Sequence, residues 1–301
     1  MRVLILGSAA GGGVPQWNCG CPNCQAARAQ GTARTQSSIA VSADGQRWAL
    51  VNASPDLRQQ LAAHPRLAPA AVRDTPISAV VLTDAEIDHT LGLMLLREAS
   101  APIPVYAPAG VAALLGAEWP LWRVLEPYAG TDVRELPEGR AVALADRGGS
   151  ALGLSCRAAA SSCQVPRYAR ARPPAPCVVS VRIEDERRGG VLVYAPAVET
   201  LTPAVRALAS GADLLLLDGT FWSAAELSAL GIGRPDARPL GHLPIGGPDG
   251  SLSALETFGA ARTIFVHVNN TNPILDPRSS ERAALVRAGA AVAEDGAEFE
   301  L

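Results

Sequence analysis

The chain has 301 residues, with 26 basic and 29 acidic side chains and a formal net charge of −3 at pH 7. This balance provides no cationic surface for nucleic acid, and because every basic residue is arginine, lysine Schiff-base and P-loop chemistry are excluded. The length suits one large domain or two small ones. No stretch predicts a membrane span or a signal peptide, so we expect a cytoplasmic protein.

The first segment joins a short apolar run, residues 3–6, to the loop GSAAGGGVPQWNCGCPNC at residues 7–24. The apolar run predicts a buried strand. The glycines lack the G-x-G-x-x-G spacing of a dinucleotide-binding loop, and Pro15 stands where the receiving helix would begin. We therefore expect them to allow close backbone packing.

Three cysteines in this loop, Cys19, Cys21 and Cys24, form C-x-C-x-x-C. In a reducing cytosol this compact spacing favours a zinc site over disulfides. A closed tetrahedral site needs a fourth ligand from elsewhere in the fold. The remaining cysteines are widely spaced and predict buried packing; they are Cys156, Cys163 and Cys177.

The first half of the chain continues with a hairpin and strand–helix units. The hairpin is expected to turn at Asp44 and Gly45. The next helix takes Ser54 as its N-cap and ends at Pro65. In chain order, we predict the hairpin at 37–54, the helix at 54–65, a strand at 77–84, a helix at 85–100, and a strand at 103–108 followed by a helix.

The second half repeats this order after a Pro- and Arg-rich stretch, residues 126–176, that predicts no clear element. We predict a hairpin at 178–197, a capped helix and strand at 202–220, the same pattern at 252–270, and a helix with a closing hairpin at 279–301. Two halves that both pass from hairpins to strand–helix units predict an α/β sandwich of two sheets covered by helices.

Histidine is scarce, with four in the chain. His64 precedes a helix-ending proline and is expected at the surface. His89, Asp218 and His267 each follow an apolar strand, where loops present side chains at the rim of a sheet. Any one of these residues could simply close off a strand end, but together with Asp88 they indicate a metal site of carboxylates and imidazoles.

These motifs resemble a known superfamily. LTDAEIDHTLG is similar to the T-H-x-H-x-D-H-x-x-G motif of metallo-β-lactamases, with Asp84 and Glu86 in place of the two leading histidines. LDGT and FVHVNN resemble its bridging-aspartate strand and its last metal-histidine strand. The cysteine loop resembles the branch with phosphonate-pathway phosphodiesterases. The matching positions in the first motif are Thr83, Asp88, His89 and Gly92.

A closer resemblance covers nearly the whole chain. The stretches GSAAGGGVPQWNCGCPNC, ARTQSSIA, NASPDLR, GHLPIGGPDG and HVNNTNPIL resemble, in order, the coenzyme PQQ synthesis protein B family. The resemblance implies a single metallo-β-lactamase-like domain, residues 1–301: an αββα sandwich of two mixed β-sheets flanked by helices. It also implies a role in pyrroloquinoline quinone (PQQ) biosynthesis, by hydroxylating the tyrosine ring of a peptide-derived Glu-Tyr precursor.

This sequence keeps only some of the metal ligands of the superfamily, and those that it keeps suit hydroxylation of a tyrosine ring. One metal would be held by His89, His267 and a carboxylate, either Asp88 or Asp218, and such a set is typical of non-haem Fe(II) oxygenases. We therefore expect Fe²⁺ at this site and a structural Zn²⁺ at the cysteine loop. The other carboxylate would orient an imidazole. Glu86 is a further candidate ligand, although Glu86 and Asp84 could equally be solvated rim carboxylates.

Two further positions come from the phosphodiesterase branch. His242 resembles its substrate-side histidine, so it is expected to act as acid or base toward a phenol, or else to be a structural loop residue. Asn270 stands where that branch has the histidine that closes the zinc site. Asn270, Asp276 or water would then be the fourth ligand of the cysteine site.

Two other function classes remain open at this stage. A carrier for PQQ or its precursor is the first alternative, and a phosphodiesterase-like hydrolase, which the missing histidines disfavour, is the second. The expected partner is a small Glu-Tyr substrate or PQQ, without nucleic acid or membrane; a homodimer is left open. Three mid-chain arginines are candidates to bind substrate carboxylates, although such a run more often forms a solvated face: Arg167, Arg170 and Arg172.

Overall fold

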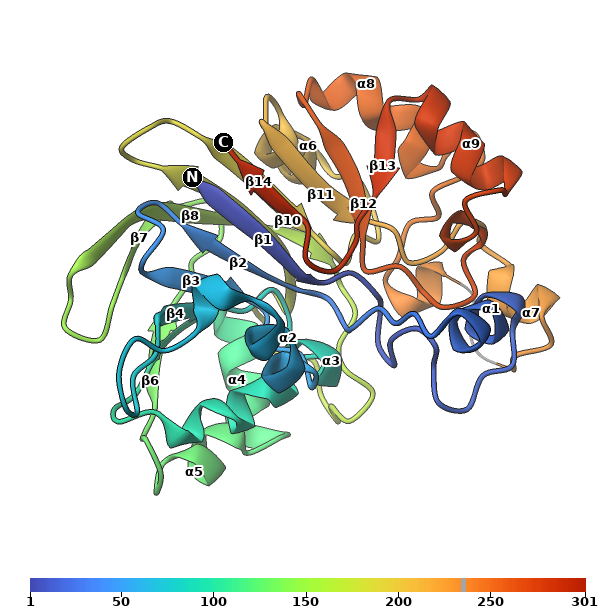
Figure 1. The fold of residues 1–301 in the computed structure, drawn as a ribbon. Helices are drawn as coiled ribbons and strands as arrows, with labels where there is room; N and C mark the ends of the chain where they lie inside the picture. The colour runs from blue at the N-terminus through green and yellow to red at the C-terminus, as the bar shows by residue number, and fades with distance from the viewer. Residues whose placement is uncertain (234–236) are drawn as a thin grey trace.

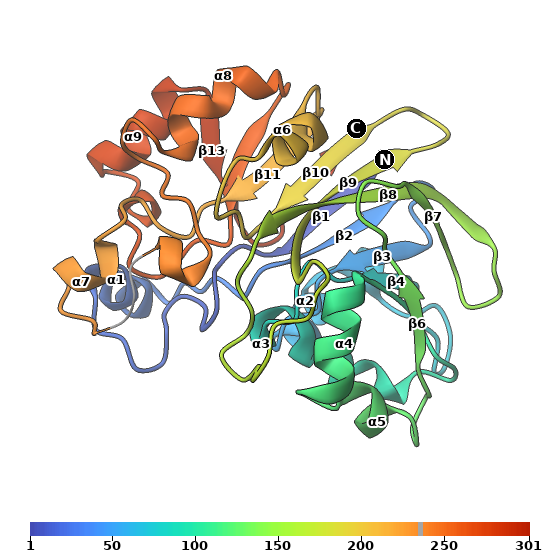
Figure 2. The same cartoon turned by 180° about the vertical axis from the view of Figure 1, so that it is seen from behind.

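Two mixed β-sheets face each other in the computed structural model, which describes residues 1–233 and 237–301. Helices cover the outer face of each sheet (Figures 1 and 2). This arrangement confirms the predicted αββα sandwich. Within the described residues, no helix is long and apolar enough to cross a membrane.

The first sheet begins with antiparallel strands and continues with parallel ones, in the order β14-β1-β2-β3-β4-β5-β6. Its strands are β14 (Glu298–Glu300), β1 (Arg2–Gly7), β2 (Ser38–Ser42), β3 (Trp48–Val51), β4 (Ile77–Val81), β5 (Pro104–Ala107) and β6 (Asp132–Glu135).

The second sheet has the same mixture, in the order β13-β12-β11-β10-β9-β8-β7, and its parallel pairs join β10 to β13. Its strands are β13 (Ala290–Val292), β12 (Thr263–Val266), β11 (Leu214–Asp218), β10 (Val191–Ala195), β9 (Val178–Asp185), β8 (Ala151–Ser162) and β7 (Val142–Ala145).

The helices are short. The α-helices are α1 (Pro22–Gln30), α2 (Leu57–Ala63), α3 (Ile87–Thr90), α4 (Ala109–Ala117), α5 (Leu121–Leu125), α6 (Pro203–Ala209), α7 (Glu226–Ala229), α8 (Leu255–Phe258) and α9 (Ser280–Arg287). The 3₁₀ turns are η1 (Pro65–Leu67), η2 (Leu91–Met94), η3 (Leu96–Glu98), η4 (Arg238–Leu240), η5 (Ser251–Ala254) and η6 (Pro273–Leu275).

The core follows from the period-2 alternation of side chains along each strand. In β11, Leu214 and Leu216 pack between the sheets, whereas Leu215 and Leu217 pack against the outer helices. Because both faces are buried, the strand appears in the sequence as an unbroken apolar run. The polar residue that ends this run, Asp218, therefore lies at the rim of the sandwich rather than in its core.

Most predicted elements are confirmed, including both hairpins and the N-cap of α6, where the Thr202 side chain accepts from the amide of Val205. Ser54 is not an N-cap, because α2 begins at Leu57 with Asp56 in the cap position. The Ser54 hydroxyl instead accepts from the Asp56 amide and contacts Gln60.

The helix predicted at 85–100 is wrong, because it breaks into α3 and the turns η2 and η3. Tertiary contacts replace its helical hydrogen bonds. The carbonyl of His89 accepts from the amide of Ala53, and the amide of Gly92 donates to the carbonyl of Ala53. A Cβ at Gly92 would lie 2.3 Å from the Ser54 carbonyl oxygen, so only glycine fits this close approach.

The predicted C-terminal hairpin is also wrong. β13 pairs with β12 in the second sheet, and β14 pairs with β1 in the first. The connection at 293–297 crosses from one sheet to the other, since the amide of Ala293 donates to Phe265 and the amide of Gly296 donates to Ile5. The stretch at 126–176 contributes β6, β7 and β8.

Candidate metal centre

Two distant chain segments bring two imidazoles and a carboxylate together. Asp88 and His89 lie in α3, directly after β4, and His267 follows β12. One ligand atom from each of the three lies within 4.8 Å of the others. Asp88 Oδ2 is 3.3 Å from Nε2 of His267 and 3.8 Å from Nε2 of His89. Ligand bonds of about 2.0–2.2 Å around one ion require donors separated by such distances. We call these three residues the histidine centre.

His89 is oriented by Asp84. Its Nδ1 lies 2.7 and 2.9 Å from the two carboxylate oxygens, and Asp84 also accepts from the Thr83 hydroxyl and the Glu86 amide. In the neutral ring, which is the form that binds a metal, this partner favours the proton on Nδ1 and leaves the lone pair on Nε2. Nε2 of His89 is buried and has no hydrogen-bond partner among the described residues. A buried nitrogen without a partner fits a metal ligand.

The charge distribution also favours a cation here. Burial disfavours a charged imidazole, yet Asp84 and Asp88 outweigh it and raise the pKa of His89 to about 9. Burial likewise disfavours ionised Asp88, but His89 and His267 hold its pKa well below the usual range. The side chain of Asp88 is 17% exposed and that of His89 only 2%, so the cluster meets solvent on the side of Asp88.

Asp218 lies in a second group with His242 and His267 whose ligand atoms are also within 4.8 Å of one another. Both Asp218 oxygens already accept hydrogen bonds: Oδ2 from His242 Nδ1 at 2.7 Å and the Val198 amide, Oδ1 from the amide and hydroxyl of Thr220. Burial opposes the charge of His242, but Asp218 outweighs it and raises its pKa. Asp218 and His242 therefore form a hydrogen-bonded pair beside the histidine centre.

Glu86 lies next to the centre but outside both groups. Among the described residues, its carboxylate belongs to no set of donors within 4.8 Å of one another. Burial, together with Asp84 and Asp88, raises the pKa of Glu86 to about 7. The mid-chain segment passes close by, because the hydroxyl of Tyr168 donates to the carbonyl of Ala85 over 2.6 Å. The three arginines of that segment, Arg167, Arg170 and Arg172, are exposed.

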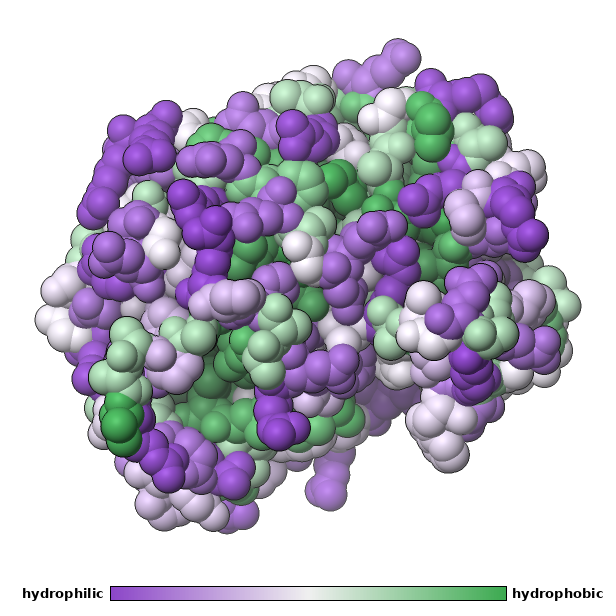
Figure 3. Space-filling view, viewed as in Figure 1, coloured by the Kyte–Doolittle hydropathy of each residue, from purple (hydrophilic) through white to green (hydrophobic). Residues whose placement is uncertain are grey.

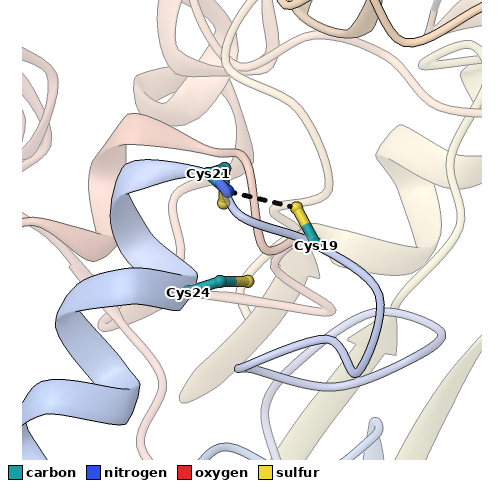
Figure 4. Close-up of side chains that lie close together, drawn as sticks. All are labelled: Cys19, Cys21 and Cys24. Atoms are coloured by element: carbon teal, nitrogen blue, oxygen red, sulfur yellow. Dashed lines mark hydrogen bonds between the residues drawn. The ribbon is translucent and has the colours of Figure 1, made fainter.

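The structure brings the three loop cysteines together. The sulfurs of Cys19, Cys21 and Cys24 lie within 4.8 Å of one another, and Figure 4 shows them pointing toward one another from the loop and the first turn of α1. The side-chain amide nitrogen of Asn270 lies 3.0, 3.5 and 3.4 Å from these sulfurs. Asp276 is paired with Arg278 instead. We call the three cysteines and Asn270 the cysteine clip.

The pKa values of two clip thiols, Cys19 and Cys21, are shifted in opposite directions. Burial opposes ionisation of Cys19, but hydrogen bonds from Cys21 and its neighbours outweigh it and lower the pKa of this thiol. Burial raises the pKa of Cys21 to about 11. A zinc ion offsets this cost because it binds cysteine as the thiolate.

Two site residues were missed from the sequence. Thr220 belongs to the LDGT motif, but only the fold brings its hydroxyl against His242 and His267. Gly11 belongs to the glycine-rich loop, and a Cβ at this position would lie 3.1 Å from Asp88 Oδ2. The glycine-rich loop therefore packs closely against Asp88, a residue of the histidine centre.

Comparisons with known proteins agree with this architecture. Residues 47–268 match the family model described as the β-lactamase superfamily domain. The chain is 46% identical over 306 residues to coenzyme PQQ synthesis protein B of Cupriavidus necator, covering 99% of both chains. It is 44% identical over 310 residues to the Pseudomonas putida protein of that name, covering 100% of both.

Solved structures of related proteins have the same fold over the whole chain. The crystal structure of Zn²⁺-bound PqqB from Methylobacterium extorquens superposes with a TM-score of 0.90 at 38% identity and covers 100% of both chains. A diphosphatase of the PhnP family, at 21% identity and a TM-score of 0.69, shares the fold and covers 100% of this chain and 97% of its own. The chain belongs to the coenzyme PQQ synthesis protein B family of the β-lactamase superfamily.

Proposed function

We propose that this protein acts in PQQ biosynthesis as an iron-dependent oxygenase that hydroxylates the tyrosine ring of a peptide-derived Glu-Tyr precursor. The observation that carries the proposal is the histidine centre, in which Asp88, His89 and His267 present three donors to one point. Within residues 1–233 and 237–301, the buried Nε2 of His89 has no hydrogen-bond partner. Two imidazoles and one carboxylate form the facial ligand set of non-haem Fe(II) oxygenases.

In this proposal His89, His267 and Asp88 hold Fe²⁺, which when bound supplies the activation of O₂. Asp88 is assigned as the carboxylate ligand in preference to Asp218. Asp88 Oδ2 faces both Nε2 atoms, whereas the Asp218 oxygens are occupied by hydrogen bonds. Asp84 keeps His89 in the tautomer that presents Nε2.

His242 and Asp218 supply the acid–base function toward the substrate. The Nδ1 proton of His242 donates to Asp218, so Nε2 is free to accept the proton of a phenol. The side chain of His242 is 12% exposed, compared with 2% for Asp218, which gives a substrate access to the imidazole rather than to the carboxylate. His242 is therefore assigned as the residue that exchanges a proton with the tyrosine hydroxyl.

The overall reaction fixes the co-substrates. Replacing a ring C–H by C–OH takes one oxygen atom from O₂. The second oxygen atom leaves as water with two electrons and two protons, which an external reductant supplies. The cysteine clip takes no part in this chemistry and is assigned to a structural Zn²⁺ held by Cys19, Cys21 and Cys24. Asn270 would be the fourth ligand through its side-chain oxygen, which requires the amide to turn over, because its nitrogen faces the sulfurs in the structure.

The test begins with metal content. Wild type, His89→Ala and Cys21→Ser are purified anaerobically and analysed for zinc and iron, with His64→Ala as the matched control at a histidine outside the centre. We expect iron to be lost only in His89→Ala and zinc only in Cys21→Ser. Iron retained in His89→Ala would overturn the assignment of the centre.

The second measurement follows the product. A Glu-Tyr-containing peptide is incubated with Fe²⁺-loaded protein, ascorbate and ¹⁸O₂, and its mass is determined. A gain in steps of one labelled oxygen, absent in His89→Ala, supports the oxygenase. An unchanged peptide together with tight PQQ binding would favour a carrier. Turnover of a phosphodiester with zinc or manganese would favour a hydrolase.

A further inference from the structure

We infer that the Thr220 hydroxyl is a positioning group that fixes the tautomer of His267 and so sets the metal affinity of the histidine centre. This inference rests on the proposed function only in taking the histidine centre as the metal site. Thr220 is buried directly after β11, between the Asp218–His242 pair and the centre.

The hydroxyl meets four polar groups. Thr220 Oγ1 lies 2.7 Å from Asp218 Oδ1, 2.8 Å from His267 Nδ1, 3.0 Å from the His267 carbonyl oxygen and 3.1 Å from His242 Nδ1. A hydroxyl has one proton to donate and two lone pairs to accept with. These four contacts therefore compete for three bonds, and the distances show which of them form.

The proton goes to the carboxylate. Asp218 Oδ1 is the nearest acceptor, and hydrogen bonds from a hydroxyl to an ionised carboxylate are the strongest of those available. His242 Nδ1 has a closer acceptor than Thr220, since Asp218 Oδ2 is 2.7 Å away. The hydroxyl oxygen is then left to accept from His267 Nδ1. This places the proton of His267 on Nδ1 and its lone pair on Nε2, the atom that faces Asp88.

The backbone around His267 depends on the same residue. His267 has a φ of +55°, an unusual conformation for a residue with a side chain. The carbonyl of Thr220 accepts from the amide of Asn269, and its hydroxyl lies against the His267 carbonyl. Thr220 thus contacts both the imidazole ring of His267 and the backbone turn that sets the direction of that side chain.

The two ligand histidines are therefore oriented differently. Asp84 contacts His89 directly with both oxygens, whereas the charge of Asp218 reaches His267 through a neutral hydroxyl. A hydrogen bond from an imidazole N–H to a neutral hydroxyl is weaker than one to an ionised carboxylate. The orientation of His267 accordingly depends on the Thr220 hydroxyl, as that of His89 depends on the Asp84 carboxylate.

The test compares Thr220→Val, which keeps the shape and removes the hydroxyl, with Thr220→Ser, which restores it. Each protein, with zinc bound in the cysteine clip, is titrated with Co²⁺. The dissociation constant of Co²⁺ at the histidine centre and the visible spectrum of the bound Co²⁺ are recorded. We expect Thr220→Val to weaken Co²⁺ binding about 10- to 100-fold and to change the spectrum, with Thr220→Ser within about threefold of wild type.

The matched control is Thr202→Val, which removes the N-cap hydroxyl of α6, whose hydrogen bond is to the amide of Val205 rather than to a residue of either site. It is expected to lower the melting temperature and leave Co²⁺ binding unchanged. Clip zinc and melting temperature are measured for every variant. If Thr220→Val does not fold, Thr220→Ala takes its place against Thr220→Ser.

Wild-type affinity and spectrum in the variant without the hydroxyl would overturn the inference. Equal weakening in Thr220→Ser would also overturn it, because packing rather than the hydroxyl would then be responsible. A wild-type protein that binds no Co²⁺ at the centre would overturn both this inference and the proposed function. A wild-type protein that hydroxylates the peptide while Thr220→Val binds Co²⁺ normally would overturn the inference alone.

Discussion

The cysteine clip and the histidine centre share one short segment but are assembled in opposite ways. The clip takes its thiols from residues 19–24, and the centre takes its donors from α3 and from the end of β12. His267 serves the centre, and Asn270, three residues later, serves the clip. A local cluster is visible in sequence spacing, whereas a cluster assembled by the fold shows only as polar residues at strand ends.

The donor types separate the two sites further. Three thiolates favour zinc in a closed structural site. Two imidazoles and a carboxylate favour iron and leave positions open for substrates. The clip should therefore govern stability and the centre should govern chemistry. Substitutions at four positions test this division.

The largest effect is expected for Cys21→Ser. Losing one of three thiolates should empty the clip of zinc and lower the melting temperature by on the order of 5 °C, while the centre keeps its metal. Metal analysis and calorimetry measure both. Cys163→Ser, at an exposed cysteine outside the clip, should change neither. Full zinc in Cys21→Ser would mean that the clip is not the zinc site.

Asp84→Asn should weaken metal binding at the centre about 10- to 100-fold, because the amide no longer provides the charge that orients His89. Co²⁺ titration measures the affinity. Asp276→Asn is the control, since this partly exposed carboxylate pairs with Arg278, and it should leave both sites unchanged. Loss of clip zinc in Asp276→Asn would instead make Asp276 the fourth clip ligand.

Asn270 tests the fourth position of the clip. Asn270→Ala should lower zinc affinity about tenfold, because three thiolates remain, and Asn270→His should raise it, because imidazole is a stronger zinc ligand than an amide. Competition with a chromophoric chelator measures both. Identical affinities in the three proteins would show that water fills the fourth position.

The smallest effect is expected for Gly11→Ala. Its new Cβ would lie 3.1 Å from Asp88 Oδ2, so the carboxylate must shift, and we expect a loss of Co²⁺ affinity at the centre of a few-fold. Gly20→Ala in the same loop is the control, because its nearest neighbour would be 3.9 Å away. Equal effects of the two substitutions would point to the loop rather than to Asp88.

Much of the fold could be predicted from the sequence because it is encoded locally. The turn at Asp44 and Gly45 and the capped start of α6 depend on neighbouring residues. The C-terminal strands could not be assigned, since only the sheets decide that β13 and β14 separate. The helix predicted after Asp84 is interrupted for a similar reason, because the carbonyl of His89 and the amide of Gly92 bond to Ala53 in another segment.

The candidate site, too, could be predicted only as far as local sequence determines it. The types of residue and their strand-end positions were visible, but Asp88 and Asp218 could not be distinguished, because both follow apolar strands. Their hydrogen bonds differ only in the fold, where Val198 and Thr220 occupy the Asp218 oxygens. Thr220 itself carried no signal beyond its place in LDGT, because a threonine after a strand is ordinary.

The split of the C-terminal strands has a consequence for synthesis on the ribosome. β1 is made first, yet its outer neighbour β14 ends at Glu300, and the outer neighbour of β12 is β13. Both sheets therefore keep an open edge at these strands until residues 290–300 have left the exit tunnel. Open strand edges invite pairing with other chains. A nascent chain is consequently open to pairing with other chains along β1 and β12 until residues 290–300 are in place.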